Sequence, residues 1–273
     1  MQRLVLDLRR TGKTVGLVPT MGALHAGHLS LVRAAKSQAE VVVATIFVNP
    51  TQFAPHEDFN QYPRTLAGDV AALAEAGCDL VFVPPADEIY PPGFSTYVEP
   101  PAVALPLEGV CRPGHFRGVA TVVLKLFHLV PADVACFGQK DYQQALVIRH
   151  MIRDLNLPIQ IDVCPIIREP DGLAMSSRNR YLSPAERERS LSLSRSLQRG
   201  EQLLAGGERS AERLLIAMHE TLEGAPVDRI DYATIVDPEN LKELATVDRP
   251  AMALIAAFVG NTRLIDNVRL SPP

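Results

Sequence analysis

The stretch Val-Gly-Leu-Val-Pro-Thr-Met-Gly-Ala-Leu-His-Ala-Gly-His, which spans Val15 to His28, decides the fold of this chain. It begins with a short apolar run, which predicts a strand buried on both faces of a parallel sheet. Proline cannot donate to the hydrogen-bond ladder, so Pro19 predicts the end of that strand. Gly22 and Gly27 supply backbone freedom for a turn, and apolar residues at helical spacing from His28 onward predict a helix.

Two histidines, His25 and His28, stand three residues apart where this strand meets the helix. The junction concentrates backbone N–H donors and the positive end of a helix dipole, so it is a natural site for phosphate. Neither of the commoner phosphate-binding loops is present. A P-loop has a glycine five residues before its Gly-Lys-Thr, but Asp7 occupies that position relative to Gly12-Lys-Thr. The Gly-x-Gly-x-x-Gly motif of dinucleotide-binding proteins does not occur either. The alternative interpretation is that both histidines are ordinary surface residues at a helix start.

Composition limits the classes of function. The 273 residues suffice for one large domain or two unequal ones, and 47% hydrophobic and 21% charged residues are typical of globular proteins. A net charge of −4 without a long basic run argues against a nucleic-acid-binding surface. The apolar runs are too short for a membrane span, and the N-terminus lacks the apolar core of a secretory signal. We therefore expect a cytoplasmic protein with neither nucleic acid nor membrane as a partner.

The four cysteines stand far apart in the sequence and form no Cys-x-x-Cys pair. This spacing predicts buried, reduced thiols and no metal site. The residues are Cys78, Cys111, Cys136 and Cys164.

Strand-like and helix-like segments alternate through the first two-thirds of the chain. The predicted strands after the first are 41–48, 80–83, 134–137 and 159–167, and the predicted helices are 69–76, 119–130 and 142–155. Almost every strand is apolar on both faces, so the order predicts an α/β fold with a parallel sheet between helices. Ligands bind beyond the carboxyl ends of strands in such sheets, and the candidate motifs follow those ends.

The last third has a different pattern. Ser183, followed by Pro184 and Glu186, predicts a helix start, and helices continue over 191–204 and 211–222. Three strands follow, at 230–236, 251–259 and 263–270, and Gly260-Asn261 predicts an antiparallel hairpin between the last two. We expect one domain over residues 1–174 and a smaller α+β domain over residues 175–273.

Uncharged amides follow the second predicted strand. Asn49 and Gln52 can donate to a carboxylate or hydroxyl and accept from an amine, or they cap the turn and do nothing more. A later loop carries Arg112, His115 and Arg117. Their guanidinium groups suit carboxylates or phosphates, or else ordinary surface ion pairs.

Two further polar strings follow later strands. Lys140 can place a compact positive charge on a phosphate, and Gln144 lies one helical turn further on, on the same side. Asp141 suits a helix N-cap and a ribose hydroxyl equally well. The string Met175 to Asn179 combines hydroxyls, backbone amides and an arginine in an anion nest, although a serine-capped helix start explains part of it.

Five motifs, in this order, resemble the pantoate–β-alanine ligase family within the His-x-Gly-His nucleotidyltransferase superfamily. They are Pro19-Thr-Met-Gly-Ala-Leu-His-x-Gly-His28, Phe47-Val-Asn-Pro-x-Gln-Phe53, Tyr62-Pro-Arg-Thr65, Gly138-x-Lys-Asp-Tyr-Gln-Gln144 and Asp171-Gly-Leu-Ala-Met-Ser-Ser-Arg-Asn179. Their spacing matches nearly the whole chain, whereas His-x-Gly-His alone indicates only the superfamily. Two features depart from the family: Gln139 stands where glutamate is frequent, and the segment before Val15 is shorter than in most relatives.

The resemblance implies a Rossmann-like parallel-sheet domain, a smaller C-terminal α+β lid domain and a homodimer. It also implies that ATP and pantoate form pantoyl adenylate and pyrophosphate, after which β-alanine displaces AMP to give pantothenate. A free carboxylate needs such activation because oxide is a poor leaving group. Mg²⁺ would arrive on the phosphates, since no set of carboxylates forms an obvious cage.

The motif match further implies roles for single residues. The implied catalytic residues are His25, His28, Lys140 and Arg178, with His28 stabilising charge at the α-phosphate. Gln52 and Gln144 would bind pantoate, and Gln52 would also bind β-alanine. The implied ATP-binding residues are Met21, Gly22, Ala23, Leu24, His25, Ala26, Gly27, His28, Gly138, Gln139, Lys140, Asp141, Ile167, Met175, Ser176, Ser177 and Arg178.

Two other functions stay open at this point. One is a nucleotidyltransferase that joins a nucleotide to a phosphorylated alcohol, and the other is a non-catalytic ATP-binding regulator. The neutral Gln52 and Gln144 argue against the first, because a phosphate acceptor calls for more cationic residues.

Overall fold

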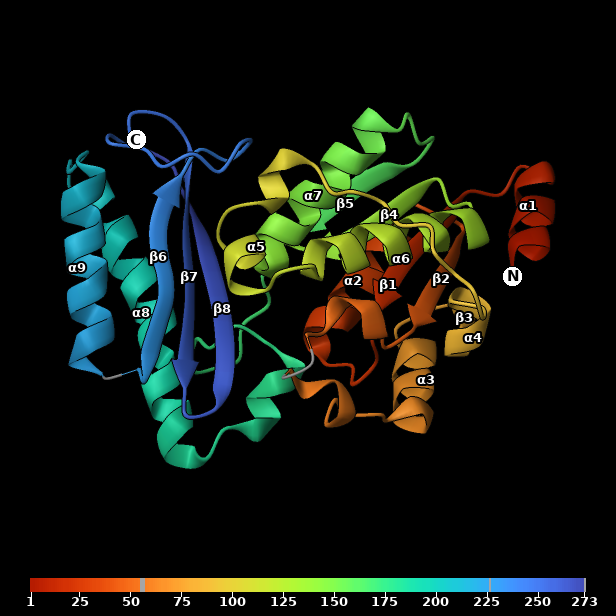
Figure 1. The fold of residues 1–273 in the computed structure, drawn as a ribbon, viewed down its shortest axis with the longest axis horizontal. Helices are drawn as coiled ribbons and strands as arrows, with labels where there is room; N and C mark the ends of the chain where they lie inside the picture. The colour runs from red at the N-terminus through yellow and green to blue at the C-terminus, as the bar shows by residue number, and fades with distance from the viewer. Residues whose placement is uncertain (55–56, 226, 273) are drawn as a thin grey trace. The chain divides into compact units, whose positions relative to one another are not determined.

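The computed structural model describes residues 1–54, 57–225 and 227–272, and it divides into two compact units (Figure 1). The first unit is Met1–Pro165 and the second is Ile166–Pro273. This division falls before the 174/175 boundary that the sequence predicts. Each unit is built around its own sheet.

The first unit contains a five-stranded parallel sheet in the order β3-β2-β1-β4-β5. The predicted α/β fold with a parallel sheet is therefore confirmed. Its strands are β1 (Val15–Thr20), β2 (Val41–Ile46), β3 (Leu80–Phe82), β4 (Val134–Gly138) and β5 (Gln160–Cys164). Its longer helices are α1 (Gln2–Arg10), α2 (Ala26–Lys36), α3 (Leu66–Glu75), α6 (His115–Leu129) and α7 (Tyr142–Asp154).

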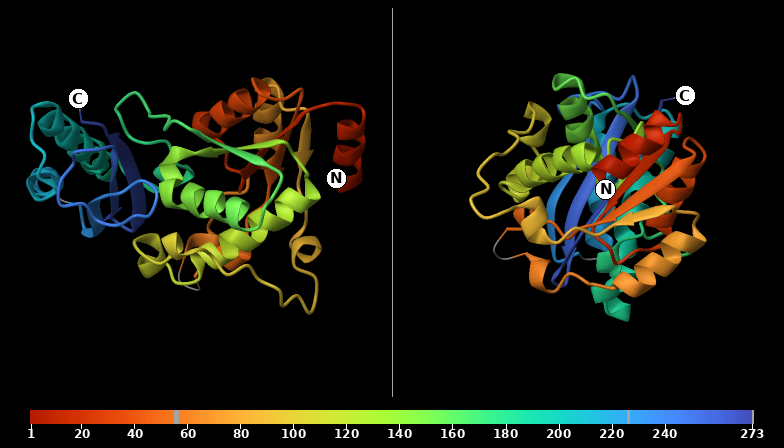
Figure 2. Two further views of the ribbon diagram at one scale, coloured as in Figure 1. Left: turned by 90° about the horizontal axis from the view of Figure 1, so that it is seen from above. Right: turned by 90° about the vertical axis from the view of Figure 1, so that its right-hand side faces the viewer.

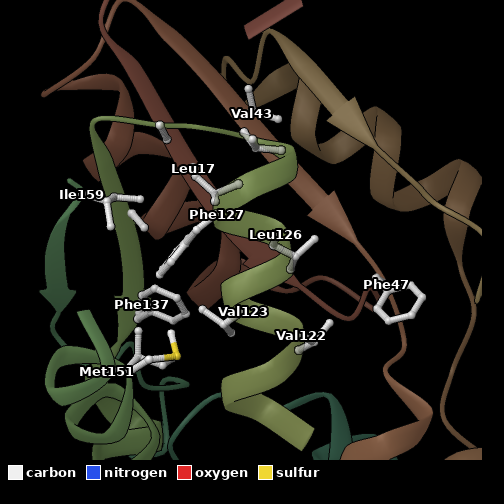
Figure 3. Close-up of a cluster of buried hydrophobic side chains, with 14 of the residues drawn as sticks. Leu17, Val43, Phe47, Val122, Val123, Leu126, Phe127, Phe137, Met151 and Ile159 are labelled. Carbon is white, nitrogen blue, oxygen red and sulfur yellow. The ribbon is translucent and has the colours of Figure 1, made fainter. Parts of the chain in front are cut away.

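Alternate residues of these strands enter two separate cores, because successive side chains of a strand point to opposite faces. On one face, Leu17 and Phe137 pack with Leu126 and Phe127 of α6 and with Met151 of α7 (Figure 3). The opposite face is covered by α2 and α3, so helices lie on both faces of the sheet (Figure 2). This double burial explains why the strands read as continuous apolar runs.

Several predicted boundaries differ from the observed ones. The first strand continues past Pro19 to Thr20. On the side that faces β4, only Gly16 and Leu17 of β1 are paired, so the N–H that proline lacks has no partner to lose there. Gly27 is not a turn residue but lies inside α2, which begins at Ala26. The second strand ends at Ile46 and the fifth at Cys164, both earlier than predicted.

Short helical segments divide the loops of this unit. The turn after β2 contains η1 (Pro50–Gln52) and η2 (Asp58–Asn60), and the turn after β4 contains η4 (Gln139–Asp141). A long proline-rich loop over 84–113 contains α4 (Ala86–Ile89), η3 (Ala102–Ala104) and α5 (Glu108–Cys111).

The second unit is the predicted α+β structure, and its three strands form one antiparallel sheet in the order β6-β7-β8. Helices α8 (Pro184–Ala205) and α9 (Ala211–Gly224) pack against β6 (Arg229–Val236), β7 (Ala251–Val259) and β8 (Thr262–Leu270), with η5 (Ser177–Tyr181) before them. Ser183 and Glu186 form the predicted capping box of α8. The pairing of Val259 with Thr262 confirms the hairpin at Gly260-Asn261. Within the described residues of the chain, no helix is both long and apolar enough to cross a membrane.

Candidate functional site

The candidate site lies at one edge of the five-stranded sheet. Strand β1 lies between β2 and β4, all three are parallel, and so the turns that follow them share the carboxyl edge (Figure 1). The chain runs from β1 outward through β2 to β3 and then returns to β4 on the other side of β1. Such a reversal of strand order leaves a crevice between neighbouring turns, which is where open α/β sheets bind ligands.

The turn between β1 and α2 has an unusual backbone. Gly22 and the following Ala23 have φ angles of 80° and 50°, and a left-handed conformation is costly for alanine. The buried carboxylate of Asp69, in the first turn of α3, holds this conformation: it accepts hydrogen bonds from the N–H of Ala23 at 3.0 Å and of Leu24 at 2.9 Å. Thr65 donates its hydroxyl to the same carboxylate at 3.1 Å.

His25 and His28 cap the start of α2 reciprocally. Nδ1 of His25 accepts from the N–H of Gly27 at 3.2 Å, and Nδ1 of His28 accepts from the N–H of His25 at 3.3 Å. The two ring centroids lie 4.1 Å apart. The pair is therefore fixed at a helix N-terminus, where backbone donors and the helix dipole favour an anion.

His28 is a neutral hydrogen-bond donor near pH 7. Burial, together with the positive charge of Lys140, lowers the pKa of His28 to about 4. Because Nδ1 accepts a backbone hydrogen bond, the proton of the neutral ring resides on Nε2. A neutral imidazole in this position can donate to a developing negative charge without repelling Lys140.

Gln52 contacts the β1–α2 turn through its side chain. Its Nε2 donates to Sδ of Met21 at 3.0 Å, and its Oε1 accepts from Nδ2 of Asn49 at 3.1 Å. Asn49 is 1% exposed and caps η1, and its Oδ1 also accepts from the hydroxyl of Tyr90 at 2.8 Å. Asn49 thus acts as a turn cap that orients Gln52, which favours the structural alternative for Asn49.

The backbone of Gln52 is held from a different direction. Nδ1 of His115 lies 2.9 Å from the carbonyl oxygen of Gln52, and Nε2 lies 3.1 Å from a guanidinium nitrogen of Arg112. Arginine only donates, so Nε2 accepts and Nδ1–H donates to the carbonyl. Burial and the charge of Arg112 lower the pKa of His115 to about 4, in agreement with a neutral ring.

Arg112 is itself fixed by a carboxylate. It donates to both oxygens of Glu57, at 2.7 and 3.0 Å, and both side chains are mostly buried. Burial opposes ionisation of Glu57, but the hydrogen bond and charge of Arg112 lower the pKa of Glu57 overall. Arg117 instead stacks 4.0 Å from the ring centre of Tyr97.

Helix α6 approaches the Gln52 turn at Gly118. A Cβ atom there would lie 2.3 Å from the carbonyl oxygen of Thr51, so only glycine fits without a shift of backbone. Nδ2 of Asn49 also donates to the carbonyl of Gly118 at 3.2 Å. The turn therefore rests directly on the helix backbone.

The end of β4 contributes Gly138, and the turn after it contributes Gln139, Lys140 and Asp141. The first three are half-buried, whereas Asp141 is exposed and takes the N-cap position of α7 without a side-chain cap hydrogen bond. Gln144 follows in the first turn of α7 and is half-buried. The charge of Lys140 acts on His28, so the structure brings this turn to the histidine pair.

The remaining predicted residues belong to the second unit. Ile167 and Met175 face each other, because the N–H of Met175 donates to the carbonyl of Ile167 at 3.0 Å across a tight loop. Ser176 caps η5 by accepting from the N–H of Arg178 at 3.3 Å, and Ser177 is buried. The string is thus both a capped helix start and a group of polar residues gathered in one loop.

Sequence reasoning missed two contributors to the site. Asp69 falls in the first turn of a predicted helix, where an acidic residue already has a local explanation, and Glu57 has no motif of its own. The sequence motif nearest to Asp69 is Tyr62-Pro-Arg-Thr65, which directly precedes α3.

A family model and curated relatives of this chain indicate the same family. A family model described as pantoate-beta-alanine ligase matches residues 1–269. A pantothenate synthetase of Acidobacterium capsulatum is 56% identical over 94% of this chain and 86% of its own length, and one of Rhodopirellula baltica is 56% identical over 96% and 93%.

Solved structures are similar as well. The pantothenate synthetase of Thermus thermophilus has a TM-score of 0.93 at 46% identity and covers 98% of both chains. The pantoate-beta-alanine ligase of Francisella tularensis, complexed with beta-gamma ATP and beta-alanine, has a TM-score of 0.79 at 35% identity and covers 98% of this chain and 95% of its own.

Proposed function

This chain belongs to the pantoate–β-alanine ligase family, and on that premise we propose that the turns after β1, β2 and β4 hold its substrates. The protein is an enzyme that condenses pantoate with β-alanine to pantothenate at the expense of ATP. In our proposal, the pantoate carboxylate attacks the α-phosphate and pyrophosphate leaves. The amine of β-alanine then attacks the acyl carbon of pantoyl adenylate, and AMP leaves.

The β1–α2 turn and the β4–α7 turn would bind the triphosphate. The rings of His25 and His28 and the charge of Lys140 would form the donor set, and the backbone of Met21 to Gly27, whose shape Asp69 and the two histidines hold, would border the phosphates. His28 is the proposed electrophile at the α-phosphate, because a neutral Nε2–H can strengthen its hydrogen bond as charge grows there. Gly138 and Asp141 would border the ribose, in line with the motif match, and Gln139 lies between them in the ATP-binding turn.

The loop of the second unit would act as a lid. Ser176, Ser177 and Arg178 would contact the phosphates, and the backbone near Ile167 and Met175 would border the adenine. The support is the family motif together with the compact arrangement of these residues within their own unit. We also propose that the functional lid domain extends over residues 175–273.

Gln52 and Gln144 would bind pantoate, and Gln52 would also meet β-alanine. Within the described part of the chain, Nε2 of Gln52 donates only to a thioether, a weak acceptor, so a hydroxyl or carboxylate oxygen is a better partner for it. Neutral amides suit a hydroxy acid that must stay reactive, since a charged partner would lower the nucleophilicity of its carboxylate.

Mg²⁺ would enter as the complex with ATP and neutralise the phosphates. Asp69, in the first turn of α3, offers a buried carboxylate beside the β1–α2 turn, but it is already engaged with two backbone N–H groups and a hydroxyl. Asp141 is exposed. This donor set fits a substrate-borne cation better than a cage of protein ligands.

The observation that carries the proposal is the placement of His28 at the start of α2, where its Nδ1 accepts from the N–H of His25 and its ring lies 4.1 Å from that of His25. Isotope exchange between pyrophosphate and ATP tests it, with exchange expected only when pantoate is present. Exchange that ignores pantoate but needs another acid would refute the substrate assignment. ATP binding without AMP formation from pantoate and β-alanine would indicate a regulator instead.

We also propose a homodimer in the cytoplasm. The support is the family resemblance and the four cysteines, all in the described residues, which form no disulfide and suit a reducing compartment. Light scattering coupled to size-exclusion chromatography tests the dimer, and a monomeric mass at micromolar concentration would refute it.

A further inference from the structure

Two cysteines that stand far apart in sequence meet across β4 and β5. The parallel register pairs Cys136 with Asp162 and Gly138 with Cys164. Residues two apart in a strand point to the same face, so Cys136, Asp162 and Cys164 share the face that α2 covers. Both thiols are buried there, at 0% and 6% exposure.

Their three ligand atoms form a compact group. The two sulfurs and a carboxylate oxygen of Asp162 all lie within 4.8 Å of one another, and Sγ of Cys164 is 3.8 Å from Oδ2 of Asp162. Among the described residues, this is the one group of three such ligands. A tetrahedral ion with bonds of about 2.3 Å to sulfur keeps its ligand atoms about 3.5–4 Å apart, so the spacing suits a small cation.

A disulfide fits this placement less well. The two cysteines are offset by two residues across neighbouring strands. With strands about 4.8 Å apart and a rise of about 3.3 Å per residue, their Cα atoms are separated by about 8 Å. A disulfide spans Cα atoms up to about 7 Å apart, so oxidation would need the strands to move.

The surroundings also point to a cation. Nε2 of Gln38, just after α2, donates to Oδ2 of Asp162 at 2.7 Å, as the amides that orient metal-bound carboxylates do. A bound divalent ion would offset the repulsion between two thiolates and the carboxylate.

We propose that Cys136, Asp162 and Cys164 bind one thiophilic divalent cation, Zn²⁺, with a water molecule in the fourth position. Two thiolates and one carboxylate are ligands that favour Zn²⁺ over Mg²⁺ or Ca²⁺. Each thiol releases its proton to solvent as its sulfur bonds to the ion. The ion fastens β5 to β4, the strand that ends in the Lys140 turn, and so stabilises the sheet without entering the reaction. The prediction of buried thiols is correct for Cys136 and Cys164 but wrong for Cys78 and Cys111, which are only partly buried, and the proposed ion departs from the expectation of no metal site.

Cobalt(II) is the probe for the test, added to the full-length reduced protein without oxygen. We expect one Co²⁺ per chain, with thiolate-to-metal charge-transfer bands and the visible bands of tetrahedral cobalt, both lost when Zn²⁺ is added. Cys136→Ala and Cys164→Ala should each abolish the charge-transfer bands, and Asp162→Asn should weaken binding about tenfold or more. Cys78→Ala and Cys111→Ala are matched controls and should leave the bands unchanged.

A second measurement uses only the unaltered chain. Zn²⁺ should slow alkylation of Cys136 and Cys164 relative to Cys78 and Cys111, as measured by mass spectrometry of peptides. Absence of cobalt bands from the unaltered protein, equal alkylation with and without Zn²⁺, or bands that survive in Cys136→Ala would each overturn the proposal. Ready formation of a disulfide between Cys136 and Cys164 without cobalt bands would also overturn it.

Discussion

Replacement of Asp69 by asparagine should damage catalysis from a position that touches no reacting atom. Asp69 is 4% exposed, and its carboxylate satisfies the N–H groups of Ala23 and Leu24 in the left-handed turn that leads to His25. Asparagine keeps one acceptor and turns an amide donor toward the other N–H, so one buried donor loses its partner.

The structure sets the size of the effect. An unpaired buried donor costs about 1–3 kcal/mol, so Asp69→Asn should lower the free energy of unfolding by about 2 kcal/mol. Asp69→Ala leaves two such donors without a charged acceptor and should cost about 4 kcal/mol. Because a displacement of about 1 Å in a catalytic group costs about 100-fold in rate, kcat of Asp69→Asn should fall by about that factor.

The assay is pyrophosphate–ATP exchange at saturating pantoate, with urea unfolding on the same preparations. Asp79→Asn is a matched control, because that carboxylate accepts from the N–H of Val42 at 2.7 Å at the opposite edge of the sheet. It should lose stability but keep kcat within about twofold. Equal losses of kcat in Asp69→Asn and Asp79→Asn would refute the idea that Asp69 positions the histidine turn.

Four further predictions concern the same edge of the sheet. His28→Ala should lower kcat by about 100- to 1,000-fold with a smaller change in ATP affinity, as shown by exchange kinetics and calorimetry. Gln144→Ala should weaken the binding of pantoate by about 1–3 kcal/mol, measured by titration. Gly118→Ala should shift the turn at Thr51 and cost about 1–3 kcal/mol in urea unfolding. The pKa of His115 is about 4 in the folded protein, below its value in the unfolded chain, so the unfolded state binds more protons between these two values. The free energy of unfolding should therefore decrease as the pH is lowered from about 6.5 to 4, and it should decrease less steeply in His115→Gln.

The sequence could place the strand-end turns because their partners are local. Val15 to His28 contains its own strand, turn and helix, and parallel strands bring the ends of β1, β2 and β4 to one edge whatever their exact lengths. Boundaries were less accurate, since Pro19 depends on how far β4 pairs with β1. The interpretation of Asn49 as a turn cap also became clear only when Tyr90 and Gly118 were in place beside it.

Long-range partners explain what the sequence could not reveal. Asp69 meets Leu24 across 45 residues, and nothing local distinguishes it from an acidic residue that stabilises its own helix. Cys136 meets Cys164 only because Cys136 lies opposite Asp162 in the register of β4 and β5. A slip of one residue would turn Cys136 and Cys164 to opposite faces, so a cobalt site that needs both cysteines would test the strand register as well as the metal site.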